Sequence, residues 1–137
     1  MMKIKNTILV VEDDICLQTI LERIFHAIDK SLKFDWVTSA EEAKLALKAE
    51  KYSLVIADHN LSGDLSGLDL WDICQAEYPG LSFILISSIG VQDFFKTVGP
   101  HRISPLFLPK PFYASECKQL LESLLPLHTQ VDAHRFR

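Results

Sequence analysis

The sequence predicts an α/β domain built on a doubly wound, five-stranded parallel sheet with helices on both faces. Short apolar runs alternate with helical patterns about five times along the chain, which is the order expected of such a sheet. The apolar runs are nearly continuous, which is typical of strands that are buried on both sides of a parallel sheet. The length of 137 residues suits one compact domain, and an apolar content of 48% can fill its core.

Five segments are expected to be strands because they are short, apolar and rich in β-branched or aromatic residues. They are Ile8–Val11, Phe34–Thr38, Leu54–Ala57, Phe83–Ile86 and Leu106–Leu108. Helical patterns follow each of them. The expected helices are a segment after Asp14 that carries Ile20, Leu21, Ile24, Phe25 and Ile28, then residues 40–49, Gly67–Glu77, Val91–Val98 and Ser115–Leu125.

Capping and breaking residues support these helix boundaries. Asp14 is a candidate N-cap, and Ser39 with Glu42 forms an S-x-x-E capping box. Proline and glycine pairs follow the third and fourth helices, and Pro126 follows the fifth. We therefore expect a domain over residues 1–125, with residues 126–137 as a tail or truncated linker.

The overall charge and the cysteines exclude several classes of protein. The net charge is −4, and Lys and Arg are spread out, so neither DNA nor an anionic membrane is an expected partner. Cys16, Cys74 and Cys117 form no CxxC motif, which argues against a zinc site or a disulfide framework. The apolar run near the N-terminus is too short for a signal peptide. We expect a soluble, cytoplasmic protein.

Polar side chains follow four of the expected strands. They are Glu12, Asp13 and Asp14 after the first strand, Asp58 after the third, Ser87 and Ser88 after the fourth, and Lys110 after the fifth. Ligands of open α/β sheets bind beyond the carboxyl ends of the strands, so these groups should meet at one edge. The sequence therefore predicts a binding or reaction site that is rich in carboxylates.

The chemistry of this edge points to phosphoryl transfer. Two like charges ~5 Å apart at an effective dielectric of ~20 repel by roughly 3 kcal/mol, so crowded carboxylates favour a bound cation. Hard oxygen ligands suit Mg²⁺ better than zinc. An aspartate can act as a nucleophile and become an acyl phosphate, while a metal and a lysine neutralise charge on the transferring oxygens.

Four motifs carry a resemblance to a known family. The runs ILVVEDD, VIADHNL, ILISS and LPKPF occur in this order, each at the end of an expected strand. Together they resemble the response regulator receiver domains of two-component signalling, of the chemotaxis-regulator-like type, over about Ile8 to Leu125. The resemblance implies a flavodoxin-like fold and a domain that accepts a phosphoryl group from a histidine kinase or a histidine phosphotransfer protein. Such a domain catalyses only its own phosphorylation and dephosphorylation.

The resemblance also implies a role for individual residues. Asp58 corresponds to the phosphoacceptor. Glu12 and Asp13 correspond to the acidic pair, with Asp13 as a direct Mg²⁺ ligand and Glu12 acting through water. Asn60 stands where a backbone carbonyl completes the metal shell.

Three further residues correspond to the parts of the family that respond to phosphorylation. Ser87 resembles the hydroxyl that turns toward the phosphoryl group, and Lys110 resembles the lysine that pairs with it. Phe107 resembles the switch aromatic. The peptide bond before Pro111 is often cis in this family.

The chain also departs from the family pattern after the phosphoacceptor. Ser62 replaces the usual proline, and Gly67 comes nine positions after Asp58 where eight is common. The loop His59–Ser66 is therefore one residue longer. Ser88 replaces a more frequent alanine, and the segment Gly99–Pro105 is unusual in its composition.

Two other interpretations belong to different classes. A Mg²⁺-dependent phosphatase of the haloacid-dehalogenase type would need an acid two positions after its nucleophile, where this chain has Asn60. A pseudo-receiver that only binds partners is the second, and the complete acidic set with Lys110 argues against it. Output is expected to go to a protein through the fourth helix, fifth strand and fifth helix, because residues 126–137 are too few for a helix-turn-helix domain.

Overall fold

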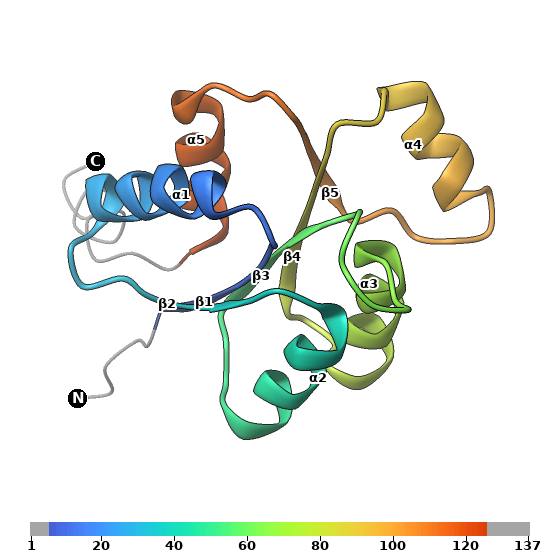
Figure 1. The fold of residues 1–137 in the computed structure, drawn as a ribbon, viewed down its shortest axis with the longest axis horizontal. Coiled ribbons are helices and arrows are strands. Elements are labelled where there is room, and N and C mark those ends of the chain that lie inside the picture. The colour runs from blue at the N-terminus through green and yellow to red at the C-terminus, as the bar shows by residue number, and fades with distance from the viewer. Residues whose placement is uncertain (1–5, 126–137) are drawn as a thin grey trace, which may run out of the picture.

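The computed structural model describes residues 6–125, and within this range five parallel strands form one sheet in the order β2-β1-β3-β4-β5 (Figure 1). The strands are β1 Thr7–Val11, β2 Lys33–Val37, β3 Leu54–Asp58, β4 Ser82–Ser87 and β5 Leu106–Pro109. The helices are α1 Ile15–Ile28, α2 Ala40–Ala49, α3 Gly67–Glu77, α4 Val91–Val98 and α5 Ala114–Leu124. The predicted fold class is therefore confirmed. The expected tail, residues 126–137, lies outside the described residues.

The helices form a layer on each side of the sheet. Helices α1 and α5 cover one face, and α2, α3 and α4 lie on the other (Figure 1). Along β1 the side chains alternate between the two layers, with Ile8 and Val10 facing α1 and α5 while Leu9 and Val11 face the other side. Because both faces of β1 are buried, its sequence is a continuous apolar run.

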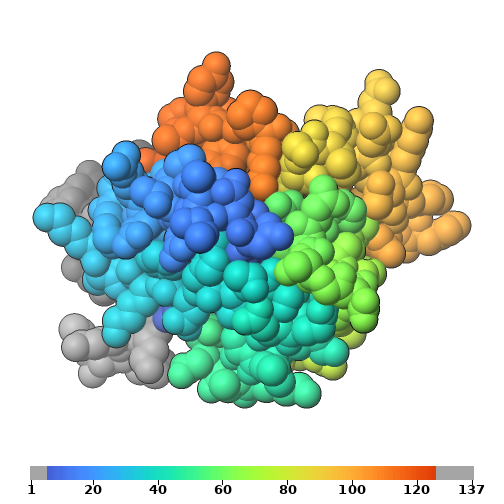
Figure 2. Space-filling model, in the orientation of Figure 1, coloured from blue at the N-terminus to red at the C-terminus, as the bar shows by residue number. Residues whose placement is uncertain are grey.

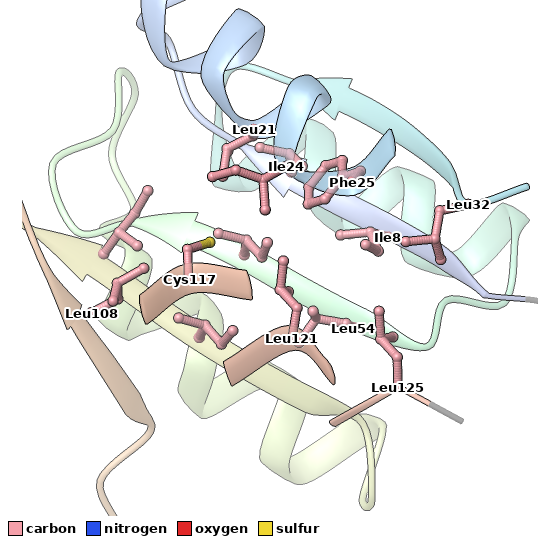
Figure 3. Close-up of a cluster of buried hydrophobic side chains, with 14 of the residues drawn as sticks. Ile8, Leu21, Ile24, Phe25, Leu32, Leu54, Leu108, Cys117, Leu121 and Leu125 are labelled. Atoms are coloured by element: carbon pink, nitrogen blue, oxygen red, sulfur yellow. The ribbon is translucent and has the colours of Figure 1, made fainter. Parts of the chain in front are cut away.

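The core between the sheet and helices α1 and α5 is shown in Figure 3. Leu21, Ile24 and Phe25 of α1 meet Cys117 and Leu121 of α5 across strand side chains. The second core is filled by side chains of α2, α3 and α4 against the opposite face. Its most buried large members are Leu9, Leu70, Leu85 and Phe94.

Two sequence expectations about burial are wrong. Ile20, assigned to the apolar face of α1, is 48% exposed, whereas Leu17 is buried. Burial on both faces holds for β1, β3 and β4 but not for the edge strands, since β2 exposes Lys33 and Asp35. An edge strand has a neighbour on one side only, so charged side chains are tolerated there.

Local signals place the helix ends where the sequence predicts them. The Asp14 carboxylate accepts a hydrogen bond from the N–H of Cys16 at 2.9 Å, so Asp14 caps α1. Ser39 caps α2, and its hydroxyl accepts from the N–H of Glu42 at 3.1 Å. Gly99 ends α4 with φ of 81°, a conformation that favours glycine. Each expected boundary lies within a residue or two of the observed one.

Among residues 6–125, no helix has the length and apolar character needed to cross a membrane. The three cysteines are free thiols, with Cys74 and Cys117 buried in the two cores and Cys16 exposed.

Candidate functional site

The carboxyl ends of four neighbouring strands bring the predicted site residues to one edge of the sheet. Asp58 is the last residue of β3, and Ser87 is the last residue of β4. Glu12 follows β1 directly, and Lys110 follows β5 directly. Because all strands run parallel, these positions fall at the same edge.

Lys110 joins two carboxylates that are distant in the sequence. Its Nζ donates a hydrogen bond to Asp58 Oδ2 at 2.8 Å and another to Glu12 Oε2 at 3.2 Å. Glu12 is 1% exposed and Asp58 is 7% exposed, so both carboxylates are largely withdrawn from water. Buried charges are stable only when they are paired, and Lys110 supplies the pairing cation here.

A third carboxylate completes an acidic cluster. Carboxylate oxygens of Glu12, Asp13 and Asp58 all lie within 4.8 Å of one another. Asp13 is exposed, which leaves one side of the cluster open to water. Three oxygen donors with an open side match the donor set that Mg²⁺ prefers. These residues therefore fit a divalent cation.

The electrostatics of the cluster show in its pKa values. Burial, followed by the hydrogen bond and charge of Asp58, raises the pKa of Glu12 to about 7, although Lys110 opposes this shift. Burial alone would lower the pKa of the Lys110 ammonium. Its hydrogen bonds and attraction to Asp58 and Glu12 outweigh burial, so the pKa of Lys110 is raised and the lysine stays charged.

Ser87 lies beside Asp58 on the neighbouring strand. In the sheet register Asp58 pairs with Ile86, so Ser87 is one position further toward the edge. Its side chain is fully buried, and its Oγ accepts a hydrogen bond from the N–H of Ile89 at 3.2 Å. The carbonyl of Ser87 accepts from the N–H of Lys110 at 2.8 Å, which ties β4 to the residue that reaches Asp58.

Phe107 is partly buried on β5 and contacts α4. Its ring centroid lies 4.1 Å from that of Phe94, with an interplanar angle of 59°. Phe94 is buried, and its ring also lies beside that of Phe95, which is 59% exposed. The contact between Phe94 and Phe107 could not be predicted from the sequence, because it depends on how α4 packs against β5.

The loop after β3 holds Asn60 close to Asp58. The N–H of Asn60 donates to Asp58 Oδ1 at 3.1 Å, so each oxygen of Asp58 has a donor. The N–H of Gly67 donates to the carbonyl of His59 at 3.0 Å. A Cβ on Gly67 would overlap the carbonyl oxygen of Asp58 and lie 2.8 Å from Leu85 Cδ1, so this position requires glycine.

The structure thus brings Glu12, Asp13, Asp58 and Lys110 into direct proximity, with Ser87 on the adjacent strand and Asn60 bonded to Asp58. Phe107 lies apart from the cluster, against α4. The peptide bond between Lys110 and Pro111 is cis.

A sheet with this strand order and an acidic cluster at its carboxyl edge matches the architecture of a signal receiver domain. A family model described as the response regulator receiver domain matches residues 8–122, and the chain belongs to this family of two-component signalling domains. No curated protein sequence matches the chain.

Solved structures of receiver domains share the fold. The signal receiver domain of an HD domain-containing protein from Pseudomonas fluorescens Pf-5 is similar with a TM-score of 0.79 and 18% identity, covering 98% of this chain and 96% of that one. The non-phosphorylated HemR receiver domain from Leptospira biflexa has a TM-score of 0.70 and 28% identity, covering 90% and 96%.

A third structure contains a metal. The receiver domain of the sensor histidine kinase PA1611 from Pseudomonas aeruginosa PAO1 has a magnesium ion coordinated in its active-site cleft. It is similar to this chain with a TM-score of 0.70 and 21% identity, covering 87% of this chain and 96% of that one.

Proposed function

We propose that this domain accepts a phosphoryl group on Asp58 in a Mg²⁺-dependent reaction and changes shape in response. The observation that carries the proposal is the contact of 2.8 Å between Lys110 Nζ and Asp58 Oδ2 inside a cluster of three carboxylates. A paired, nearly buried aspartate with a cation beside it is suited to nucleophilic attack on phosphorus.

The reaction forms one bond and breaks one. An oxygen of Asp58 bonds to phosphorus while the bond from phosphorus to the imidazole nitrogen of a donor histidine breaks. The electron pair leaves with that nitrogen, and the product on Asp58 is an acyl phosphate. Lys110, already bonded to Asp58 Oδ2, is placed to neutralise charge on the transferred oxygens.

Mg²⁺ would be held by Asp13 and Asp58 directly, by Glu12 through water and by the backbone carbonyl of Asn60. It would supply electrostatic stabilisation of the phosphoryl oxygens. The donor set supports this assignment, because three carboxylates lie within 4.8 Å and Asp13 is open to solvent. Water reaching the same opening would hydrolyse the acyl phosphate slowly and restore Asp58.

The partners follow from this chemistry. A histidine kinase or histidine phosphotransfer protein would donate the phosphoryl group, and a downstream protein would read the result. Large apolar side chains lie exposed on α4, on β5 and around them, including Phe95 at 59% and Leu106 at 44%. Such side chains favour a protein partner over DNA. Phe107 contacts Phe94, whose ring lies beside Phe95, so a change at Phe107 would reach this surface through Phe94.

Intact-mass spectrometry after incubation with acetyl phosphate and Mg²⁺ tests the proposal. Wild type should gain one phosphoryl group, and Asp58→Ala should gain none. An equal adduct yield in Asp58→Ala would reject Asp58 as the acceptor. Steady turnover of a generic phosphate ester would favour a phosphatase instead, although Asn60 cannot serve as its general acid.

A further inference from the structure

The middle of the loop after β3, residues 59–66, is fastened to the start of α2. The hydroxyl of Ser62 donates to the carbonyl of Thr38 at 3.2 Å, and Ser62 forms an isolated parallel bridge with Ser39. The N–H of Leu65 donates to Glu41 Oε1 at 3.3 Å. In Figure 2 the green loop lies beside the cyan start of α2.

The carboxylate of Glu41 sits in the concave side of this loop. One of its oxygens accepts from Leu65, while the other lies so close to Gly63 that a Cβ at that position would overlap it. Gly63 has φ of 97°, which other residues rarely adopt. Residues 63 and 65 therefore both approach the Glu41 carboxylate, and the φ of Gly63 favours glycine at this position.

This loop also carries a group of the proposed metal site. Its first part is held by the bond from Asn60 N–H to Asp58 Oδ1, and its last part by the capping box of Ser66 and Asp69. Between these ends, Ser62 bonds to Thr38, Leu65 bonds to Glu41, and the side chains of Leu61 and Leu65 pack against the second core. When only a fraction of molecules has a competent site, the apparent affinity for a ligand falls by that fraction. Fastening the loop should therefore raise the affinity of the site.

We infer that Glu41 is a positioning residue for the magnesium site. Its carboxylate holds residues 63–65 against α2 and thereby keeps the backbone of Asn60 beside Asp58. This inference rests on the proposed function, since it assumes that Mg²⁺ binds at the acidic cluster. Glu41 itself touches neither the metal nor the phosphoryl group.

Two measurements on the full chain test the inference. Amide hydrogen exchange of residues 60–65 in metal-free protein measures how firmly the loop is held against α2. A Mg²⁺ titration followed by amide NMR shifts measures the affinity of the site for the metal. Glu41→Ala should speed exchange at Leu65 and weaken Mg²⁺ affinity by about tenfold, the lower end of the loss seen when groups supporting metal ligands are removed.

The Glu41→Gln variant separates the hydrogen bond to Leu65 from the negative charge of Glu41. Its side-chain oxygen can still accept from Leu65, but the negative charge is gone. Most of the wild-type affinity should return in this variant. If Glu41→Gln binds Mg²⁺ as weakly as Glu41→Ala, the effect is one of charge and the positioning role is rejected.

Glu42→Ala is the matched control, because Glu42 is the next residue of α2 and carries the same charge. Glu42 accepts from the hydroxyls of Thr38 at 2.6 Å and Ser39 at 3.2 Å, so its loss should lower the melting temperature. Its Mg²⁺ affinity should match that of wild type well below that temperature. Unchanged exchange at Leu65 in Glu41→Ala, or an equal loss of affinity in Glu42→Ala, would overturn the inference. Wild type without any Mg²⁺ response would instead reject the proposed function, while faster exchange in Glu41→Ala would still establish the fastening.

Discussion

Lys110 and Glu12 show how single residues balance charge in this site. Lys110 faces two carboxylates, and even so the pKa of Glu12 is raised to about 7 because its side chain is buried beside Asp58. Burial makes the largest contribution to this rise in pKa, and the hydrogen bond and charge of Asp58 add to it. A bound cation would favour the charged form of these carboxylates.

Ser87→Ala separates accepting the phosphoryl group from responding to it. The hydroxyl is fully buried and its oxygen accepts from the N–H of Ile89, so its own O–H can be donated to a phosphoryl oxygen. A hydrogen bond to a charged group is worth about 1.5–3 kcal/mol, enough to bias a two-state equilibrium by at least tenfold. Ser87→Ala should still gain one phosphoryl group but show smaller amide NMR shifts on phosphorylation.

Ser88→Ala is the control for this experiment. Ser88 is the exposed neighbour of Ser87, so the loss of its hydroxyl should leave the wild-type response intact. Shifts of equal size in Ser87→Ala and wild type would count against the switch role of Ser87.

At the scale of the element, α3 is positioned by the contact between its first residue and β3. Gly67 lies against the carbonyl of Asp58, and its N–H reaches the carbonyl of His59. The capping box of Ser66 and Asp69 completes the turn, with Ser66 N–H donating to Asp69 at 2.9 Å. The same residues that begin the helix therefore hold the backbone next to the proposed phosphoacceptor.

Gly67→Ala should destabilise the fold by about 1–3 kcal/mol, the usual cost of inserting a methyl group into a packed site. The added Cβ would displace the carbonyl of Asp58 or the side chain of Leu85. Urea unfolding measures the loss. Gly90→Ala provides the comparison, because a Cβ there meets no atom within 4 Å. Its cost should stay below about 1 kcal/mol, since only the N-cap preference of α4 changes. Equal stabilities of the two variants would contradict the packing argument.

Local signals explain why the elements were largely predictable from the sequence. Helices α3 and α4 were predicted with their observed bounds, because a glycine or a proline lies at or near their ends. Ile20 was misassigned because its spacing of four from Ile24 fits an apolar stripe, whereas the buried stripe of α1 begins at Leu17 and continues through Leu21 and Ile24. The site residues could be placed at strand ends, but the contact of Glu41 with Leu65 could not. That contact depends on the path of an irregular loop, which no periodic pattern encodes.

At the scale of the whole molecule, the sheet order is what assembles the site. Strand β1 lies next to β3 in the centre of the sheet, so Glu12 and Asp58 meet although α1, β2 and α2 separate them in sequence. The same order places β5 at the edge, from which Lys110 reaches across β4 and β3 to Glu12, 98 positions earlier in the sequence. The stability of the fold and the geometry of the site therefore both depend on this strand order.

Mg²⁺ should raise the melting temperature of the protein near neutral pH. A ligand that binds only the native state adds RT ln(1 + [L]/Kd), which is about 2.7 kcal/mol at a hundred times Kd. Thermal melts with and without Mg²⁺ measure this effect. Asp13→Ala should abolish the response, because it removes the exposed carboxylate of the cluster.

Asp14→Ala is a matched control for Asp13→Ala. Asp14 is the adjacent acid and caps α1, so its replacement should lower stability by about 1 kcal/mol. Mg²⁺ should still raise the melting temperature of this variant. A wild-type Mg²⁺ response in Asp13→Ala would exclude Asp13 as a ligand.

The long separation between Asp58 and Lys110 also has a consequence during synthesis of the chain. The two residues are 52 positions apart, so at usual translation rates of 5–20 residues per second Lys110 is made roughly 3–10 s after Asp58. Throughout that interval the nascent chain contains Asp58 but lacks Lys110. Under the proposed function, unfinished chains on the ribosome should therefore be inert toward a phosphodonor and should not compete with the mature protein for it.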